Sequence, residues 1–138
     1  MRFMIIRKAD EETEAGMMPS EELLEAMARY NEELVNAGVM VVGEGLKPTA
    51  RAARVSFSGG TPTVIDGPFT ETKELIAGYS ILECASLQEA IEWTKKWPVL
   101  DGHGNVQLEI RPVYTLADFG DSEGVQHHAR LQEQMANR

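Results

Sequence analysis

The sequence predicts an α+β fold of the ferredoxin-like type, in which two helices cover one face of an antiparallel sheet. Two segments have apolar residues at helical spacing, and strand-like runs flank both of them. A further pair of strand-like runs lies between these units and reads as an extra hairpin. The resulting order, β-α-β, hairpin and β-α-β, is typical of this fold. The 138 residues suffice for one domain with an ordinary core.

The first unit is predicted from residue 3 to residue 42. Residues 3–6 are apolar and indicate a strand. Ser20 can cap a helix that Gly38 ends, and its apolar positions recur at helical spacing: Leu23, Met27, Tyr30 and Leu34. Residues 39–42 indicate the second strand, and the glycine-rich residues 43–48 are expected to end it.

The extra hairpin is predicted over residues 53–66. Residues 53–58 alternate between apolar and polar side chains, residues 59–62 form a turn, and residues 63–65 return as the partner strand. We expect a short helical turn over residues 70–75, capped by Thr70.

The second unit begins with a strand over residues 79–84. Ser86 and Glu89 have capping-box spacing and start a helix that Pro98 stops, with an inner stripe at Leu87, Ala90, Ile91, Thr94 and Trp97. Alternation of Val106, Leu108 and Ile110 predicts the last strand. Residues 115–138 form a polar extension with an expected amphipathic helix near 122–136.

Composition excludes several classes of partner. The chain has 13 Lys and Arg against 22 Asp and Glu, a net charge of −9, which disfavours non-specific binding to nucleic acid and to anionic membranes. No apolar run approaches the ~20 residues of a membrane span, and the first residues do not resemble a signal peptide. With a single cysteine, Cys84, we predict a cytoplasmic protein without an internal disulfide.

A sheet with helices on one face leaves its other face bare, and large apolar patches are rarely left in water. We therefore expect a homodimer in which two such faces enclose a cavity. In the last strand, the apolar residues suit the helices, so Glu109 and Arg111 are predicted to point to the open side. Phe57 and Tyr79 are expected to pack in the core.

Residues 66–74 combine a tight turn, Asp66-Gly67-Pro68-Phe69, with a group of charged side chains. Asp66 can cap the turn through its carboxylate, which is the commoner role, or serve as a general base in the cavity. The second role requires burial to raise its pKa above the ordinary ~3.9. Phe69 and Lys73 are candidate ligand-binding residues of the same turn, and Lys73 can instead form a solvated ion pair.

Three more residues are candidates for the site. Arg111 suits a carboxylate or enolate oxygen, with Glu109 orienting it or acting as a base, although the two can also form a plain ion pair. Glu44 lies between two glycines, which permits either a β-bulge or the close approach of a ligand. His103 lies in a glycine-rich loop and is either incidental or an acid–base group.

The sequence predicts neither a cofactor nor a metal. The glycines around Glu44 lack the third glycine and the helix of a dinucleotide-binding motif, and no nucleophile elbow is present. His127 and His128 are adjacent, so a helix would point them about 100° apart, which does not suit a zinc pair.

The chain resembles the YCII-related proteins, specifically the DGPF-type branch, over roughly residues 1–114. The resemblance rests on residues 66–69 followed by 71–74, and on the stretches 1–6, 42–46 and 109–113 in the same order. It implies a dimeric α+β barrel as one domain, with residues 115–138 as a C-terminal extension. Related proteins on this scaffold include isomerases, cofactor-free monooxygenases and a dehydrochlorinase-like activity. The His–Asp pair described for the YCII branch has no matching histidine close before Asp66.

Three functional hypotheses follow. The first is a homodimer that binds a small molecule in a polar cavity and performs cofactor-free isomerase- or lyase-like acid–base chemistry through Asp66, Glu109 and Arg111. The second is a non-enzymatic sensor or accessory regulatory module, because some DGPF-type proteins are linked to extracytoplasmic sigma factors. The third is a structural dimer whose motif residues hold the turn and the interface.

Overall fold

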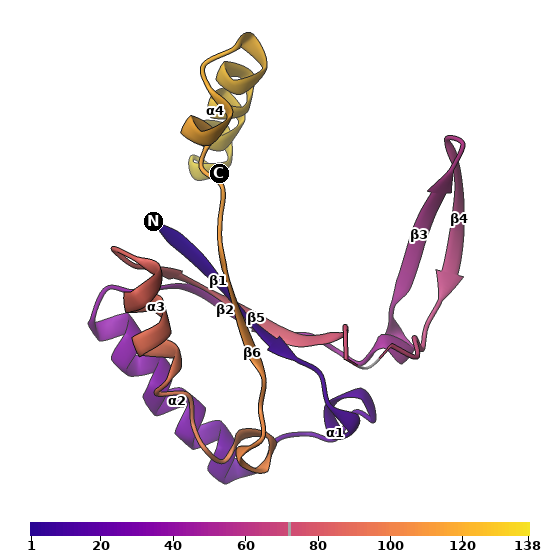
Figure 1. Cartoon of the computed structure of the whole chain (residues 1–138), viewed down its shortest axis with the longest axis vertical. Helices are drawn as coiled ribbons and strands as arrows, with labels where there is room; N and C mark the ends of the chain where they lie inside the picture. The colour runs from indigo at the N-terminus through magenta and orange to yellow at the C-terminus, as the bar shows by residue number, and fades with distance from the viewer. Residues whose placement is uncertain (72) are drawn as a thin grey trace.

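The computed structural model describes residues 1–71 and 73–138. Its main sheet is antiparallel, has the order β2-β5-β1-β6, and consists of β1 (Arg2–Lys8), β2 (Met40–Gly45), β5 (Ile76–Glu83) and β6 (Leu108–Pro112). Helices α2 (Glu21–Asn36) and α3 (Leu87–Thr94) lie together on one face of this sheet (Figure 1). The predicted α+β ferredoxin-like fold is therefore confirmed.

The core lies between the sheet and these two helices. On β1, Phe3 and Ile5 are buried, whereas Met4 and Ile6 on the other face are partly exposed. The buried cluster also includes residues of β5, α2 and α3 and their flanks: Tyr30, Leu34, Val39, Leu82, Cys84 and Ala90. Complete burial of a large apolar side chain stabilises the fold by roughly 1.5–3 kcal/mol.

Helix α2 starts and packs as the sequence indicates. The Ser20 hydroxyl accepts a hydrogen bond from the Leu23 N–H at 3.1 Å and so caps the first turn. Tyr30 and Leu34 are its buried residues, and the Tyr30 hydroxyl donates to the Trp93 carbonyl at 2.9 Å. This bond ties α2 to α3.

Several element boundaries differ from the prediction. β2 continues through Gly45 instead of ending at residue 42, because Glu44 and Gly45 pair with Tyr79 and Gly78 of β5. β6 starts only at Leu108, since a 3₁₀ segment, η2 (Asp101–Gly104), precedes it.

The helices differ at their ends as well. α3 ends at Thr94, before Pro98, and Leu87 is exposed, so the inner stripe begins at Ala90. A short helix, α1 (Glu11–Glu14), is new, and a capping box between Asp10 and Thr13 starts it. The helical turn expected over residues 70–75 includes Thr72, which lies outside the described residues.

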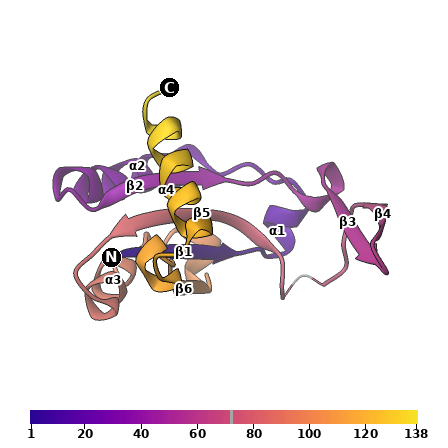
Figure 2. The ribbon, with the colours of Figure 1, turned by 90° about the horizontal axis from the view of Figure 1, so that it is seen from above.

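The extra hairpin forms a sheet of its own. β3 (Ala53–Ser58) and β4 (Thr61–Asp66) pair antiparallel, and every residue of both strands is exposed. The 3₁₀ turn η1 (Thr49–Arg51) precedes it. Figure 2 shows the hairpin beyond the ends of the main strands.

The C-terminal segment also stands apart from the main sheet. It contains a 3₁₀ turn, η3 (Leu116–Phe119), and α4 (Glu123–Ala136), which agrees with the helix expected near 122–136. In Figure 1 this segment extends away from the end of β6. None of the helices in the described part of the chain has the length and apolarity needed to cross a membrane.

Candidate functional site

The face of the main sheet opposite α2 and α3 carries a band of side chains in register. On β1, Ile6 pairs with Tyr79 of β5 on one side and with Glu109 of β6 on the other. Tyr79 in turn pairs with Glu44 of β2. Adjacent strands lie about 4.8 Å apart, so this row spans about 14 Å from Glu44 to Glu109.

The neighbouring row on the same face is mostly apolar. Met4 pairs with Ile81 and Arg111, and Ile81 pairs with Val42. We call the two rows together the open face; its members are Met4, Ile6, Val42, Glu44, Tyr79, Ile81, Glu109 and Arg111. It has an apolar centre and ionisable groups at both edges, and the orientation predicted for Glu109 and Arg111 agrees with the register.

The β6 edge of the open face holds three charged side chains. The Arg111 Nη1 lies 3.3 Å from Glu109 Oε2, and the Lys8 Nζ lies 3.5 Å from Glu109 Oε1. The hydrogen bond from Arg111, followed by the charge of Lys8, lowers the pKa of Glu109. Glu109 is therefore a carboxylate at neutral pH.

Lys8 is the residue of this group that the sequence analysis missed. The strand predicted over residues 3–6 stops before Lys8, but β1 continues through it. The spacing Met4, Ile6, Lys8 is the period of a strand and is the signal that could have found it.

The β2 edge holds a phenol beside a carboxylate. The Tyr79 hydroxyl donates to Glu44 Oε2 at 3.3 Å. The charge of Glu44 raises the pKa of Tyr79, with the hydrogen bond adding to this effect. Tyr79 is thus a protonated donor on the open face, and its expected place in the core is wrong because β5 buries Gly78, Ser80 and Leu82 instead.

Two hollows adjoin Lys8. One of about 460 Å³ is lined by Lys8, Gln107, Leu108 and Glu109. The other, of about 330 Å³, lies toward the start of α1, and Lys73 is among its lining residues. A ligand at the β6 edge would therefore meet the ammonium of Lys8 between two open volumes.

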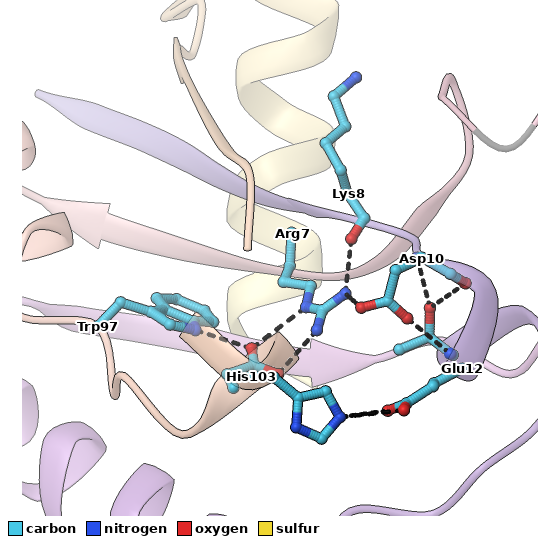
Figure 3. Close-up of polar contacts among 8 residues, drawn as sticks. Arg7, Lys8, Asp10, Glu12, Trp97 and His103 are labelled. Atoms are coloured by element: carbon cyan, nitrogen blue, oxygen red, sulfur yellow. Dashed lines mark hydrogen bonds and ion pairs between the residues drawn. The ribbon is translucent and has the colours of Figure 1, made fainter. Parts of the chain in front are cut away.

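On the side of β1 that faces the helices, Arg7 forms a closed polar cluster (Figure 3). Its Nε and Nη2 bond the Asp101 carboxylate at 3.2 and 2.7 Å, and its Nη1 bonds Asp10 at 3.2 Å and the Lys8 carbonyl at 2.7 Å. The Trp97 Nε1 also donates to Asp101 at 2.9 Å. Burial opposes the charge of Arg7, but its bonds to Asp101 and Asp10 outweigh this effect and raise its pKa. The cluster joins β1, α1 and η2 and serves the fold.

His103 belongs to the surface beside this cluster. Its Nε2 lies 3.0 Å from Glu12, and both side chains are exposed. Its backbone has φ +55°, a left-handed conformation that is uncommon for a non-glycine residue. In Figure 3 the Lys8 ammonium points away from His103, so the structure does not bring His103 to the β6 edge.

The Asp-Gly-Pro-Phe turn fastens the base of the hairpin to η1. The Gly67 N–H donates to the Ala52 carbonyl, and the Phe69 N–H donates to the Thr49 hydroxyl, both at 3.0 Å. The Arg54 guanidinium lies 3.8 Å from the centre of the Phe69 ring. A Cβ on residue 67 would lie 1.7 Å from the Thr49 carbonyl oxygen, so the turn requires glycine there.

Asp66 ends β4, paired with Ala53, and it is exposed. Among residues 1–71 and 73–138, its carboxylate takes part in no hydrogen bond and does not meet Glu109 or Arg111. The structure thus brings together Lys8, Glu109 and Arg111 and places Glu44 on the same face. Asp66, Phe69 and His103 do not adjoin this group.

Comparison with known proteins identifies the family. Residues 1–116 match the model of the YCII-related domain, and the chain belongs to this family. An uncharacterised protein of Rhizobium meliloti (strain 1021) is 36% identical over 75 residues, which is 54% of this chain and 60% of that protein. The chain therefore spans about three-fifths of the length of this curated relative.

The chain is also similar to a solved structure. It is 5-chloro-2-hydroxyhydroquinone dehydrochlorinase (TftG) from Burkholderia phenoliruptrix AC1100 in complex with 2,5-dihydroxybenzoquinone. The two chains are 17% identical with a TM-score of 0.48, and the match covers 83% of this chain and 94% of that one.

Proposed function

We propose that this YCII-related protein is a homodimer that binds a small organic acid between two open faces and performs cofactor-free acid–base chemistry on it, such as isomerisation or elimination. The observation that carries this proposal is the β6 edge. There, Arg111 and Lys8 hold the Glu109 carboxylate beside the apolar centre of the open face.

The homodimer follows from the apolar centre. Met4 pairs with Ile81, which pairs with Val42, and Ile6 follows Met4 on the same face of β1. Burying apolar surface contributes about 25 cal/mol per Å², so a second open face is a favourable cover. Two facing sheets would also shield the charged edge groups from solvent, which strengthens their interaction with a ligand.

The arrangement favours a ligand with a carboxylate and a ring or short apolar chain. Arg111 presents a planar fork that suits a carboxylate, and Lys8 adds a second cation. The apolar part would lie on Met4 and Ile6. The Tyr79 hydroxyl, at the other edge, donates its one proton to Glu44, so it is placed to accept a hydrogen bond from a polar group at the far end of the ligand.

Acid–base chemistry follows because a ligand carboxylate would compete with Glu109 for the guanidinium of Arg111. In the free protein, Arg111 bonds Glu109 and lowers its pKa, which makes it a weak base. A ligand carboxylate that takes Arg111 removes this bond, so the pKa of Glu109 rises toward its ordinary value. Glu109 can then accept a proton from the carbon next to a ligand carbonyl, while Lys8 stabilises the enolate oxygen. Returning the proton to that oxygen completes the isomerisation.

The other predicted residues have secondary parts in this proposal. Lys73, beside the second hollow, and Glu44, beside Tyr79, would contact the polar ends of the ligand. Asp66, Phe69 and His103 do not adjoin Glu109 within one chain, so they would join the site only from a second copy. In such a dimer, Asp66 of the second copy would serve as a second proton carrier.

The test uses phenylpyruvate, whose keto and enol forms differ in ultraviolet absorption, as substrate probe, and benzoate as a non-reacting probe. We expect the wild-type chain to accelerate tautomerisation and both acids to raise the melting temperature. Glu109→Gln should lower the rate by about 10²-fold or more while benzoate still binds. Arg111→Gln should weaken binding of both probes.

The chain offers a matched control. Arg29 lies 3.4 Å from Glu25 on α2, an exposed pair like Arg111 and Glu109 but outside the open face. Arg29→Gln should change neither rate nor binding. Equal losses in Arg29→Gln and Arg111→Gln would contradict the proposal, as would an active Glu109→Gln variant.

A further inference from the structure

We infer that the β3–β4 hairpin of one copy packs against the C-terminal arm, residues 113–138, of a second copy. This inference rests on the homodimer of the proposed function but is independent of its ligand and chemistry. It concerns two apolar surfaces outside the open face and proposes that each covers the other.

The hairpin has one strongly apolar face. Val55 and Phe57 point to the same side of β3, and in register they pair with Val64 and Pro62 of β4. Val55, Phe57 and Val64 are 57%, 71% and 65% exposed, so the expectation that Phe57 lies in the core is wrong within one chain. A two-stranded hairpin is at best marginally stable in water alone, and this one needs a cover.

The C-terminal arm presents a second uncovered apolar surface. Ser122 caps α4, and Val125, Leu131 and Met135 lie within about 120° of one another around the helix. Leu131 and Met135 are 42% and 54% exposed. A 14-residue helix is marginal without tertiary contacts, so α4 also needs a partner.

The positions of the hairpin and the C-terminal arm indicate how they would meet. In Figure 1 the hairpin and α4 both lie on the side of the sheet away from α2 and α3. Figure 2 shows α4 over the strands and the hairpin beyond one end of them, so a second copy on the open face would lie next to both. If the two-fold axis reverses the strand direction, the hairpin of each copy reaches the arm of the other, and one contact occurs twice.

Charge favours this pairing over the alternatives. Residues 49–66, which form η1 and the hairpin, contain Arg51 and Arg54 against Asp66, a net charge of +1 in a chain of net charge −9. The arm has two arginines against four acids: Asp118, Asp121, Glu123 and Glu133. Packing the hairpin against the C-terminal arm brings opposite net charges together. Packing two hairpins or two arms against each other brings like net charges together.

Crosslinking between differently substituted copies tests the inference. Ser58→Cys places a thiol on the hairpin and Gln134→Cys places one on α4, while the native Cys84 is buried. The two variants are mixed, allowed to exchange subunits and treated with a short bis-maleimide. We expect a mixed crosslinked pair in the mixture that exceeds the products of either variant alone. Products linking only two hairpins or only two arms would overturn the inference.

A double-mutant cycle gives a second measurement. Phe57→Ser and Leu131→Ser should each raise the dimer dissociation constant about 10-fold, equivalent to about 1.4 kcal/mol, and the double variant should lose less than the sum. Leu24→Ser, at an exposed leucine of α2, is the matched control and should change nothing. A strictly additive double variant would mean that the two residues contact different surfaces and would overturn the inference.

The outcomes separate this inference from the proposed function. A dimer that binds benzoate but gives no mixed crosslink would overturn the arm pairing alone and leave α4 free for another protein. A wild-type chain that sediments as a monomer would overturn both.

Discussion

At the scale of single residues, Tyr30 shows how burial determines a protonation state. Its hydroxyl donates to the Trp93 carbonyl, and its ring lies 5.6 Å from that of Trp97. Burial, followed by the charges of Glu33 and Cys84, raises the pKa of Tyr30 to about 12. The neutral phenol is therefore part of the folded core.

This pKa predicts an alkaline limit of stability. Because the folded value exceeds the ordinary ~10, the contribution of Tyr30 is fully present below pH 10 and is lost as the pH rises through about 12. Tyr30→Phe should lower the free energy of unfolding by about 1 kcal/mol at pH 7, through the lost hydrogen bond, and should flatten the decline above pH 10. Urea unfolding at pH 7, 10 and 11 measures both. If the free energy of unfolding of Tyr30→Phe falls above pH 10 as steeply as that of the wild type, other groups cause the decline.

The site residues illustrate what alternation along a strand can reveal. Glu109 and Arg111 could be placed on the open side from the sequence because apolar neighbours in the same strand fixed its inner face. Tyr79 could not, since β5 has apolar residues on both faces and its periodicity is lost. Whether Asp66 serves the site depends on a second copy and stays a prediction.

At the scale of elements, the order of strands and helices was predictable and several of their ends were not. Gly43 indicated a break, yet β2 runs through it because Gly43 pairs with Ser80 of β5. A Cβ at this position would lie 2.7 Å from the Met40 Cε, so glycine suits the strand there. The sequence alone does not reveal such a tertiary contact. The hairpin was placed correctly by its alternation, but its separation from the main sheet was not foreseen.

The base of the hairpin gives the sharpest prediction for an element. Gly67→Ala would drive a Cβ into the Thr49 carbonyl, so η1 and the hairpin must move apart. We expect a loss of about 1–3 kcal/mol and faster proteolysis of residues 48–70. Gly45→Ala is the control, because no atom of the described residues lies within 4 Å of its added Cβ and its φ is not positive. Denaturant unfolding and limited proteolysis compare the two variants. Equal effects would contradict the steric requirement for glycine at residue 67.

At the scale of the whole molecule, the chain exposes three apolar surfaces: the open face, the hairpin face and the stripe of α4. Each is unpartnered within the described part of the chain, and the hairpin and the C-terminal arm lie on the side of the sheet that carries the open face (Figure 1). A single second copy can cover all three. The proposed dimer is therefore the unit in which the hollows beside Lys8, the hairpin and the C-terminal arm would acquire their function.

The central claim is that a second copy covers the open face, and sedimentation velocity of the wild-type chain and Met4→Glu tests it most directly. Met4 lies at the centre of that face, so a buried glutamate there should leave only single chains with unchanged circular dichroism, whereas the wild type should sediment with twice the mass. Met18→Glu, at a residue that is 82% exposed, should stay dimeric. A monomeric wild type at micromolar concentration, or a Met4→Glu variant that keeps the double mass, would contradict the account.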